Sequence, residues 1–390
     1  MFIFGIFPEF FFSFYFSVVG EFVHFFLLDF RRVVVLTGEE FDTTKKFTHI
    51  KDAFEALAPK SNISVNHTEI LPAFYTTGYK ERLKKIVEQT KDRTRIYLFI
   101  GENVALLALM KLLGEMEESG DFALKEYVIL AVDNSIDDHM DNVTACHQFI
   151  APPWSSVLYH TKSGSDWQKL HTLYRSVLRI VPDVEDFKVK RTMMDSIKEY
   201  STRPPFNIEA HDLLKTSIVP MEAIYTYDAV KVYALALHQI LERQGNVCNG
   251  TDVVQTIIEM GSYPSDIQGI NVTINRDADS QGTSMLLAMV SHPECGCKYE
   301  KVGHFLDSSE PSSFPLLRLD GTKQILWRLT NESGKPMVPT GVPACGFDNE
   351  LCQLSAEFLL GFSLVSLMVL ICAWLCIRCG FLLKNHPSIP

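Results

Sequence analysis

One uncharged stretch near the carboxyl terminus limits what this chain can fold into more than any other feature. Residues 358–377 contain no Asp, Glu, Lys or Arg, and Leu, Val, Ile, Phe, Met and Ala dominate them. A helix rises about 1.5 Å per residue, so about 20 such residues cross a hydrocarbon core of about 30 Å. We therefore expect a single transmembrane helix over 358–377, followed by a stub at 378–390.

Charges on the two sides of this stretch predict its orientation. The stub carries Arg378 and Lys384 and no acidic residue, whereas Asp348 and Glu357 precede the stretch. Lys and Arg next to a membrane span are retained on the cytoplasmic side. The charges therefore predict a single-pass type I protein with a cytoplasmic stub and its ectodomain outside.

Glycosylation sequons also place the body of the chain in the secretory pathway. Six asparagines begin an Asn-x-Ser/Thr sequon, the acceptor of N-linked glycans, and all of them precede the apolar stretch. They are Asn62, Asn66, Asn142, Asn249, Asn271 and Asn331. Chance accounts for some sequons in a chain of this composition, yet the whole set favours a glycosylated ectodomain.

Cysteine usage agrees with an oxidising compartment. An even number of cysteines precedes the apolar stretch, which is compatible with disulfide bonds. Cys345 and Cys352 flank a turn-like Gly-Phe-Asp-Asn segment, and we predict that they pair. The pairing of the others stays open; they are Cys146, Cys248, Cys295 and Cys297.

A zinc site is the alternative interpretation of Cys295 and Cys297, with His292 nearby. Zinc sites usually leave about two to four residues between paired cysteines and add a second ligand pair, which this sequence lacks, so disulfides are favoured. The remaining cysteines lie in or just beyond the apolar stretch, where we expect them to be reduced; they are Cys372, Cys376 and Cys379. The last of them is a candidate for palmitoylation.

The first 30 residues have two interpretations. Residues 1–30 are rich in Phe and contain no Lys or Arg, whereas a signal peptide has a basic start and a small-residue cleavage site. Residues 10–19 can still serve as the apolar core of an atypical signal sequence, cut after Gly20. The alternative is that residue 1 is not the natural start of this domain, and both interpretations stay open.

From Arg31 onward the sequence alternates short apolar runs with amphipathic stretches. Continuous apolar strands separated by helices indicate parallel β-α units, with helices on both faces of a sheet and right-handed crossovers. We predict strands over 33–36, 63–70, 95–100 and 127–132, and helices over 44–57, 79–91 and 104–116. The fold class predicted for the body of the chain is therefore α/β.

The sequence contains no catalytic, metal-binding or cofactor-binding constellation that we can identify. Gly101 resembles a phosphate-loop position, but no further glycine pattern or Gly-Lys-Ser/Thr follows it. Four aspartates within 133–141 suggest either a cation site or, in our preferred interpretation, a solvated loop and helix start. Residues 277–282 begin like a calcium loop but lack its final Glu, and a polar turn between strands at 270–274 and 285–290 explains them better.

A pair of predicted helices carries a resemblance to a known family. Residues 224–241 are apolar around nearly the whole helix, so we expect that helix to be buried. A second helix follows at 253–260, with Thr251 or Asp252 as its N-cap. The pair, with its Tyr-Asp-Ala-Val opening at 227–230, resembles the receptor-family ligand-binding region, which is the ectodomain of natriuretic peptide receptors and receptor guanylate cyclases.

The resemblance continues along the chain to the membrane. It covers the 269–290 hairpin and the strand at 324–329 that contains Trp327. The cysteine loop at 343–352 resembles the juxtamembrane loop of nematode-type receptor guanylate cyclases. This loop, directly ahead of the apolar stretch, is the most specific part of the resemblance.

The resemblance implies a bilobal ectodomain of the periplasmic-binding-protein type I kind over residues 31–352. On that pattern, 31–221 and 266–352 form a membrane-proximal lobe, and 222–265 are helices of a membrane-distal lobe whose sheet has no counterpart here. The chain is thus expected to be truncated at both ends relative to the family. The ligand cleft would be incomplete, so no residue is assigned to ligand contact.

The resemblance also implies a function. We expect a receptor-like protein of the plasma membrane that binds an extracellular peptide or small molecule, or pairs with a full-length receptor as a homodimer or heterodimer. The stub at 378–390 has no room for that family's kinase-like and cyclase domains, so we expect no enzyme activity and no cofactor. The net charge of −11 disfavours nucleic acid as a partner.

Two alternatives to this functional interpretation stay open. The chain is either a non-signalling decoy or dominant-negative subunit, or it is an incomplete gene model of a receptor guanylate cyclase that signals through cGMP.

Overall fold

The computed structural model describes most of the chain between Arg31 and the apolar stretch. The described residues are 31–38, 46–71, 73, 76–132, 164–182, 193, 195–197, 199–205, 207, 221–268, 271–276, 280–281, 284–294, 296–306, 316–348 and 366–375. Several predictions fall outside them, namely those for the 1–30 segment, the aspartates within 133–141, Asn142, Cys146, Cys295, Cys352, Cys376, Cys379 and the 378–390 stub.

Five parallel strands form one half of a large sheet. They are β1 (Arg32–Thr37), β2 (Ser64–Ile70), β3 (Ile96–Ile100), β4 (Val128–Val132) and β5 (Val177–Pro182), paired in the order β2-β1-β3-β4-β5. All positions of β3 and β4 are buried, because parallel strands of this kind are covered on both faces. The strands predicted at 33–36, 63–70, 95–100 and 127–132 are therefore confirmed, but the strand predicted at 324–329 was wrong, because only Ile325 pairs there, in an isolated bridge with Val290.

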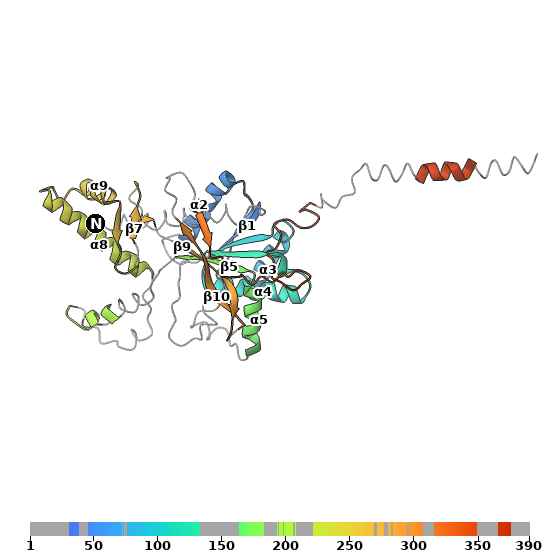
Figure 1. Ribbon diagram of the computed structural model, residues 1–390, viewed down its shortest axis with the longest axis horizontal. Coiled ribbons are helices and arrows are strands. Elements are labelled where there is room, and N and C mark those ends of the chain that lie inside the picture. The colour runs from blue at the N-terminus through green and yellow to red at the C-terminus, as the bar shows by residue number, and fades with distance from the viewer. Residues whose placement is uncertain are drawn as a thin grey trace, which may run out of the picture. The chain divides into compact units, whose positions relative to one another are not determined.

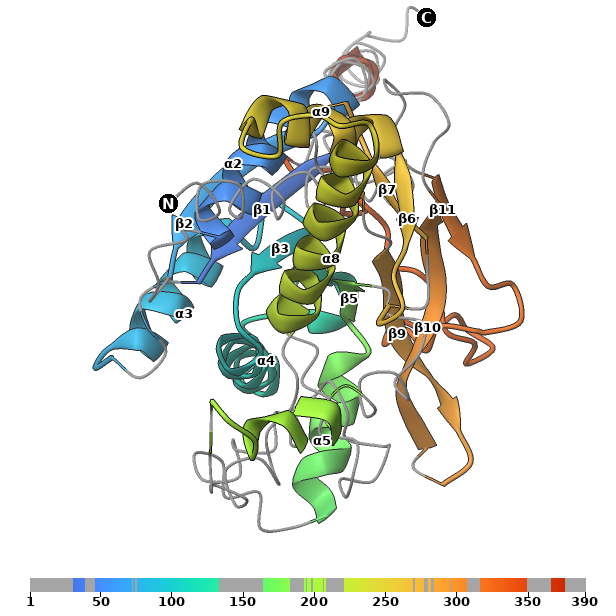
Figure 2. The ribbon, with the colours of Figure 1, turned by 90° about the vertical axis from the view of Figure 1, so that its left-hand side faces the viewer.

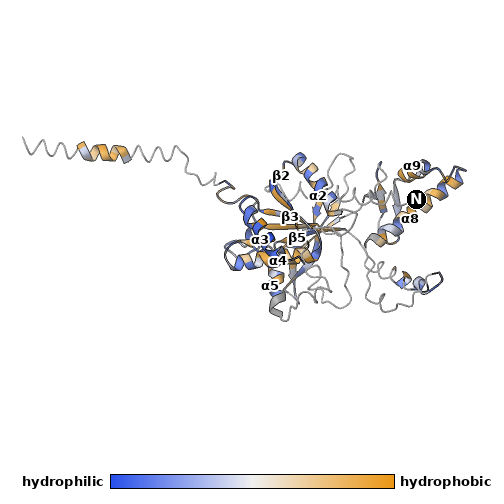
Figure 3. Ribbon diagram, turned by 180° about the vertical axis from the view of Figure 1, so that it is seen from behind, coloured by the Kyte–Doolittle hydropathy of each residue, from blue (hydrophilic) through white to orange (hydrophobic). Residues whose placement is uncertain are grey.

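Helices cover both faces of this sheet. They are α2 (Lys46–Leu57), α3 (Tyr79–Thr90), α4 (Asn103–Glu118) and α5 (Gly164–Tyr174), with short 3-10 turns η1 (Ala58–Ser61) and η2 (Leu124–Glu126). Along β1, Val33 and Val35 pack on the α2 side, whereas Val34 and Leu36 pack with α3 and α4. Figure 1 shows the sheet between these helices. In the hydropathy colours of Figure 3 the strands are apolar and the flanking helices are amphipathic.

Three antiparallel strands complete the large sheet. β9 (Ser284–His292), β10 (Gly296–Leu306) and β11 (Leu316–Leu319) extend it beyond β5, so that its order is β11-β10-β9-β5-β4-β3-β1-β2. The junction is the antiparallel pairing of β5 with β9, in which Arg179 lies opposite Leu287. The sheet is therefore built from two distant parts of the sequence.

A smaller apolar cluster forms around two further helices and a small sheet. The helices are α8 (Met221–Glu242) and α9 (Gly250–Met260), and the sheet has the order β6 (Ser262–Pro264), β7 (Asn271–Ile274), β8 (Ser280–Gln281). Along one face of α8, residues spaced four apart are buried in this cluster; they are Val232, Ala236 and Ile240. Figure 2 shows α8 and α9 beside β6 and β7.

Three expectations for this region were wrong in detail. The strand at 271–274 pairs with β8, not with 285–290, which is part of β9 in the large sheet. The N-cap of α9 is Asn249, whose Oδ1 accepts a hydrogen bond from the Thr251 N–H at 3.2 Å, because the helix begins earlier than predicted. Finally, α8 is buried on one stripe only, and Tyr227, Val230 and Leu241 remain about half exposed.

The carboxyl-terminal residues 342–390 form a separate unit. Residues 366–375 are helical, and large apolar side chains are exposed along that helix, such as Leu367, Val369 and Trp374. It is mostly orange in the hydropathy colours of Figure 3. Within the described part of the chain, no helix is long and apolar enough to cross a membrane.

Candidate functional site

The order of the parallel strands reverses at β1. The chain pairs β2 on one side of β1 and then crosses to place β3 on its other side. In open parallel sheets, ligands bind outside the carboxyl ends of the strands at such a reversal, because the loops diverge there. This edge of the sheet, where β1 ends at Thr37 and β3 ends at Ile100, is the candidate site.

The backbones of two glycines meet at this edge. The Gly38 N–H donates a hydrogen bond to the Ile100 carbonyl at 2.8 Å. A Cβ placed on Gly101 would lie 3.3 Å from the Gly38 nitrogen and 3.1 Å from the Phe99 ring, which is tighter than ordinary contacts. Glycine at 101 therefore permits the two strand ends to approach closely. This steric requirement accounts for the glycine, so a phosphate-binding loop is not needed to explain it.

Helix α4 begins directly after these glycines. Glu102 is its N-cap, with extended backbone angles, and its side chain makes no capping hydrogen bond. The first N–H groups of a helix have no partner within the helix, and the helix dipole places partial positive charge there. The edge therefore presents hydrogen-bond donors and a weakly positive potential.

Three buried polar side chains without partners lie along the same edge. Thr37 ends β1, Asn103 begins α4, and Ser284 begins β9 opposite Pro182 at the end of β5. Their side chains are 1%, 4% and 1% exposed, respectively. Thr37 Oγ1, Asn103 Oδ1 and Ser284 Oγ have no hydrogen-bond partner among the residues that the structure describes. We call these three residues the edge triplet.

Leaving a buried polar atom without a partner costs about 1–3 kcal/mol, so most proteins avoid it. Thr37 and Asn103 lie next to each other at this edge, where one bound polar molecule would reach both, whereas Ser284 on β9 lies four strands further along the sheet. The Thr37 hydroxyl and the amino end of α4 offer donors, and Asn103 Oδ1 offers an acceptor. The sequence pattern identified only Gly101 and its neighbours, and nothing in the sequence distinguishes Thr37 or Ser284 from other threonines and serines.

A second polar cluster surrounds the buried Cys297. Its Sγ lies 3.7 Å from His171 Nδ1 and 4.0 Å from Arg175 Nη2, and its thiol is free. Nearby, burial raises the pKa of Tyr299 well above its ordinary value. No group of three His, Cys, Asp or Glu side chains among the described residues could hold a metal ion. The zinc interpretation of this region therefore gains no support.

The chain that follows β11 packs against the large sheet and its helices. Trp327 is buried in the core on the α2 side, and the Leu326 N–H donates to the Met289 carbonyl at 2.8 Å. Arg328 Nη2 lies 2.5 Å from Glu117 Oε2, near the carboxyl end of α4. Helix α4 thus has its first residue at the candidate edge and its last turn in contact with the chain that leads to residue 341.

The other predicted site residues lie away from the edge. Four sequon asparagines are exposed, and they are Asn62, Asn249, Asn271 and Asn331. Asn66 is only partly exposed, and its Nδ2 donates a hydrogen bond to the Arg93 carbonyl at 2.9 Å. Cys345 is disulfide-bonded. The thiols of Cys248, Cys297 and Cys372 are free.

Comparison with known proteins gives one family and several relatives. A family model described as the receptor family ligand binding region matches residues 23–291. Receptor-type guanylate cyclase Gyc76C of Drosophila melanogaster is 27% identical over 333 residues, which cover 78% of this chain and 20% of that protein. Guanylate cyclase 32E of the same organism is 26% identical over 341 residues, covering 84% of this chain and 25% of that protein.

A more distant relative comes from a sea urchin. The Speract receptor of Strongylocentrotus purpuratus is 24% identical over 345 residues, which cover 83% of this chain and 29% of that protein. The chain therefore spans between a fifth and a third of the length of these curated relatives. The family match contains β1 to β8, nearly all of β9, and with them the whole edge triplet.

Proposed function

Because this chain belongs to the family that shares the receptor family ligand binding region, we propose that it is the ligand-binding ectodomain of a cell-surface receptor. Its mixed α/β fold, with a large sheet rich in parallel strands, fits a periplasmic-binding-protein-like ectodomain, and this region is not catalytic. The observation that carries the proposal is the pair of buried polar atoms of Thr37 and Asn103 at the strand-order reversal, with Ser284 further along the same edge of the sheet.

The chemistry of the edge selects the class of ligand. The Thr37 hydroxyl and the N–H groups at the amino end of α4 favour a molecule that brings a carboxylate or a carbonyl oxygen, while Asn103 Oδ1 would accept a hydrogen bond from a donor on that molecule. Amino acids, small dicarboxylates and the carboxyl end of a short peptide all carry such a group. Binding would satisfy atoms that are otherwise buried without partners, so it would gain more than an equivalent contact at an exposed surface.

Helix α4 would carry the effect of ligand toward the membrane. It spans 16 residues, or about 24 Å, between Asn103 at the edge and the last turn that holds Arg328 through Glu117. A ligand that moves the amino end of α4 would thereby move the chain that leads to Cys345. This is the step at which ligand binding and signalling would be coupled.

The exposed apolar helix at 366–375 supports the proposed topology. A helix with apolar side chains on all sides is stable only when it is buried in protein or in lipid. We propose that it is the centre of a transmembrane span over 358–377 in a single-pass type I protein of the plasma membrane, with 378–390 in the cytoplasm. Cys345 would pair with Cys352 just outside the membrane, since these two are only a short loop apart.

The lobes of the ectodomain remain part of this proposal. Residues 31–221 and 266–352 would form the membrane-proximal lobe and 222–265 the partial distal lobe. Packing of β7 with α8 and α9 in one apolar cluster favours extending the distal part to Gln281. The receptor would signal as a homodimer or through a full-length family member.

A thermal-shift titration of the full chain in detergent tests the ligand proposal. The probes are amino acids, small dicarboxylates and short peptides with free carboxyl ends. We expect one class to raise the melting temperature in proportion to the logarithm of its concentration above the Kd. Thr37→Val should abolish that shift, whereas Ser284→Ala tests whether the ligand extends along the edge to β9. Thr90→Val, at an equally buried threonine away from the edge, should keep it.

The result that would overturn the proposal is a shift of equal size in Thr37→Val and wild type. A panel without any response would count against a small polar ligand at this edge. Surface labelling with a membrane-impermeant reagent tests the topology independently, because labelling only after permeabilisation would place the ectodomain inside the cell.

A decoy or dominant-negative subunit is the second candidate function. The observation that favours it is the exposed stripe of α8, where Tyr227, Val230 and Leu241 are 46%, 58% and 60% exposed. Such a surface favours association with another protein. Co-purification with a full-length family receptor, lost in Val230→Asp, would support this function, whereas ligand binding by a monodisperse monomer would contradict it.

A further inference from the structure

A polar cavity lies at the opposite end of the parallel strands from the edge triplet. Its volume is about 750 Å³, and it is bordered by the residues where β1 and β2 begin and by the end of α2 and η1. There Arg32 lies opposite Ser64, and the Ser64 N–H bonds to the Arg31 carbonyl at 2.7 Å. The proposed ligand edge makes no use of this cavity.

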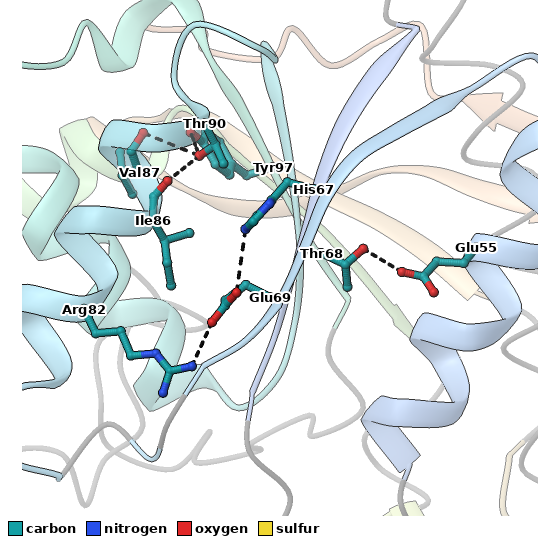
Figure 4. A network of polar contacts seen from close by, with 9 residues as sticks. All are labelled: Glu55, His67, Thr68, Glu69, Arg82, Ile86, Val87, Thr90 and Tyr97. Carbon is teal, nitrogen blue, oxygen red and sulfur yellow. Dashed lines mark hydrogen bonds and ion pairs between the residues drawn. The ribbon is translucent and has the colours of Figure 1, made fainter.

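The lining of the cavity suits a molecule rich in hydroxyl and amide groups. It includes two guanidinium groups, a carboxylate, an amide and two hydroxyls, from Arg31, Arg32, Glu55, Asn62, Ser64 and Thr68. Thr68 Oγ1 donates to Glu55 Oε1 at 2.6 Å, which fixes this part of the wall (Figure 4). Arg31 is exposed, and its guanidinium has no partner in the described part of the chain.

Asn62 on the wall of this cavity opens the sequon Asn62-Ile63-Ser64. Its backbone is held in the left-handed region at φ 58°, with its N–H bonded to the Pro59 carbonyl at 3.1 Å. Its side chain is exposed, and the structure records no hydrogen bond from its amide to any described residue. The backbone is therefore fixed while the amide nitrogen is free to carry a substituent.

The neighbouring sequon at Asn66 is in the opposite situation. Its Nδ2 donates to the Arg93 carbonyl at 2.9 Å, and its Oδ1 accepts from Ser64 Oγ at 2.8 Å. Asn66 lies at the irregularity where β2 shifts register against Val33 and Val34 of β1. A sugar on its Nδ2 would occupy the space next to the Arg93 carbonyl, so it would conflict with this local fold.

We propose that Asn62 carries an N-linked glycan whose first N-acetylglucosamine residues lie in this cavity, and that Asn66 carries none in the folded protein. In the transfer, Asn62 Nδ2 attacks C1 of a lipid-linked oligosaccharide. The N–C1 bond forms, the bond from C1 to the pyrophosphate oxygen breaks, and Nδ2 loses one proton as the lipid pyrophosphate leaves. The guanidinium of Arg31 then donates hydrogen bonds to the sugar oxygens. This inference rests on the proposed ectodomain function.

Site occupancy is the first test. The full chain is expressed in animal cells, and glycopeptides are quantified by mass spectrometry, with Asn331 as the reporter of entry into the secretory pathway. We expect Asn62 and Asn331 to be occupied and Asn66 to be unoccupied. An occupied Asn331 with an empty Asn62 would overturn this inference and leave the proposed function intact. If no sequon is occupied, the proposed function fails, and this inference fails with it.

The location of the first sugars is tested by trimming the glycan enzymatically. An endoglycosidase that leaves one N-acetylglucosamine should preserve the melting temperature. Asn62→Gln, which carries no sugar, should lower it by about 2 °C or more. Asn271→Gln is the matched control and should have no effect, because this exposed sequon asparagine does not line the cavity.

Substitution of Arg31 distinguishes a glycan whose first sugars lie in the cavity from one that projects into solvent. Arg31→Ala should lower the melting temperature of the protein glycosylated at Asn62 and leave Asn62→Gln unchanged, so that the two changes are not additive. Equal effects of Arg31→Ala in both backgrounds would show that the sugars do not lie in the cavity. They would then project into solvent.

Discussion

Arg328 and Glu117 form an ion pair across 211 positions of sequence, with Arg328 Nη2 2.5 Å from Glu117 Oε2. Their side chains are 14% and 26% exposed, so water screens the pair less than it screens a surface pair. The contact attaches the chain leaving the large sheet to the last turns of α4.

The first prediction concerns the strength of this ion pair. A double-mutant cycle with Glu117→Gln and Arg328→Met should give a coupling energy of about 1–2 kcal/mol, measured by urea unfolding. The pair between Lys80 and Glu115 is the control, because its side chains are 60% and 50% exposed and its coupling should be close to zero. Equal coupling energies in the two cycles would show that the pair of Arg328 and Glu117 is no stronger than an exposed surface pair.

The second prediction concerns stability without ligand. Thr37→Val removes a buried hydroxyl that has no partner, so it should raise the free energy of unfolding by about 1 kcal/mol. Thr90→Val should lower it by about 1–2 kcal/mol, since Thr90 Oγ1 donates to the Ile86 carbonyl at 2.7 Å and lies 2.9 Å from Tyr97 Oη (Figure 4). Urea unfolding of the two variants measures this contrast. A loss of stability in Thr37→Val would show that the hydroxyl already has a partner.

The third prediction concerns alkaline pH. Burial raises the pKa of Tyr127 to about 12, whereas an unfolded tyrosine titrates near about 10. The unfolded state therefore releases its proton first, and stability that is complete below pH 10 is lost as pH rises from about 10 to 12. Tyr127→Phe should reduce this loss by up to about 1.4 kcal/mol per pH unit in that window.

At neutral pH the same substitution should cost about 1 kcal/mol. The reason is that Tyr127 Oη donates to the Lys91 carbonyl at 2.6 Å and accepts from Arg95 Nη1 at 2.6 Å. Urea unfolding at pH 8, 10 and 11 separates the two effects. An unchanged pH dependence in Tyr127→Phe would contradict the raised pKa of this residue.

The fourth prediction concerns the close approach of the strand ends. Gly101→Ala should destabilise the protein by about 1–3 kcal/mol, because the new methyl would press against the Gly38 backbone and the Phe99 ring. Gly250→Ala is the control, since nothing lies within 4 Å of its Cβ position and it stands in the first turn of α9. Thermal unfolding should show a lower melting temperature for the first variant only. Similar melting temperatures would mean that the edge can relax around a side chain.

Local patterns predicted the parallel half of the fold well, for a physical reason. Strands such as β3 and β4 are buried on both faces, so they are continuous apolar runs that stand out in the sequence. The role of β9 was not predictable in this way. Its apolar run at 285–290 is equally clear, but its partner β5 lies about 100 residues earlier, and periodicity carries no information about such pairing.

The candidate site was predictable only in part. Gly101 could be singled out because glycine after a buried strand marks a special backbone position. Thr37 and Ser284 could not, because their importance lies in burial without a partner, which is a property of the packed fold. The cap of α9 was misplaced because Asn249, Thr251 and Asp252 are all good N-caps, and only the observed helix start decides among them.

The pairing of β5 with β9 has a consequence for how the protein is made. Arg179 and Leu287 are neighbours in the sheet, yet the whole of α8, α9 and the small sheet is synthesised between them. Until β9 leaves the ribosome, the free edge of β5 has no strand to pair with, and an unpaired edge is prone to aggregation. Completion of the large sheet therefore has to wait until β9 has been synthesised.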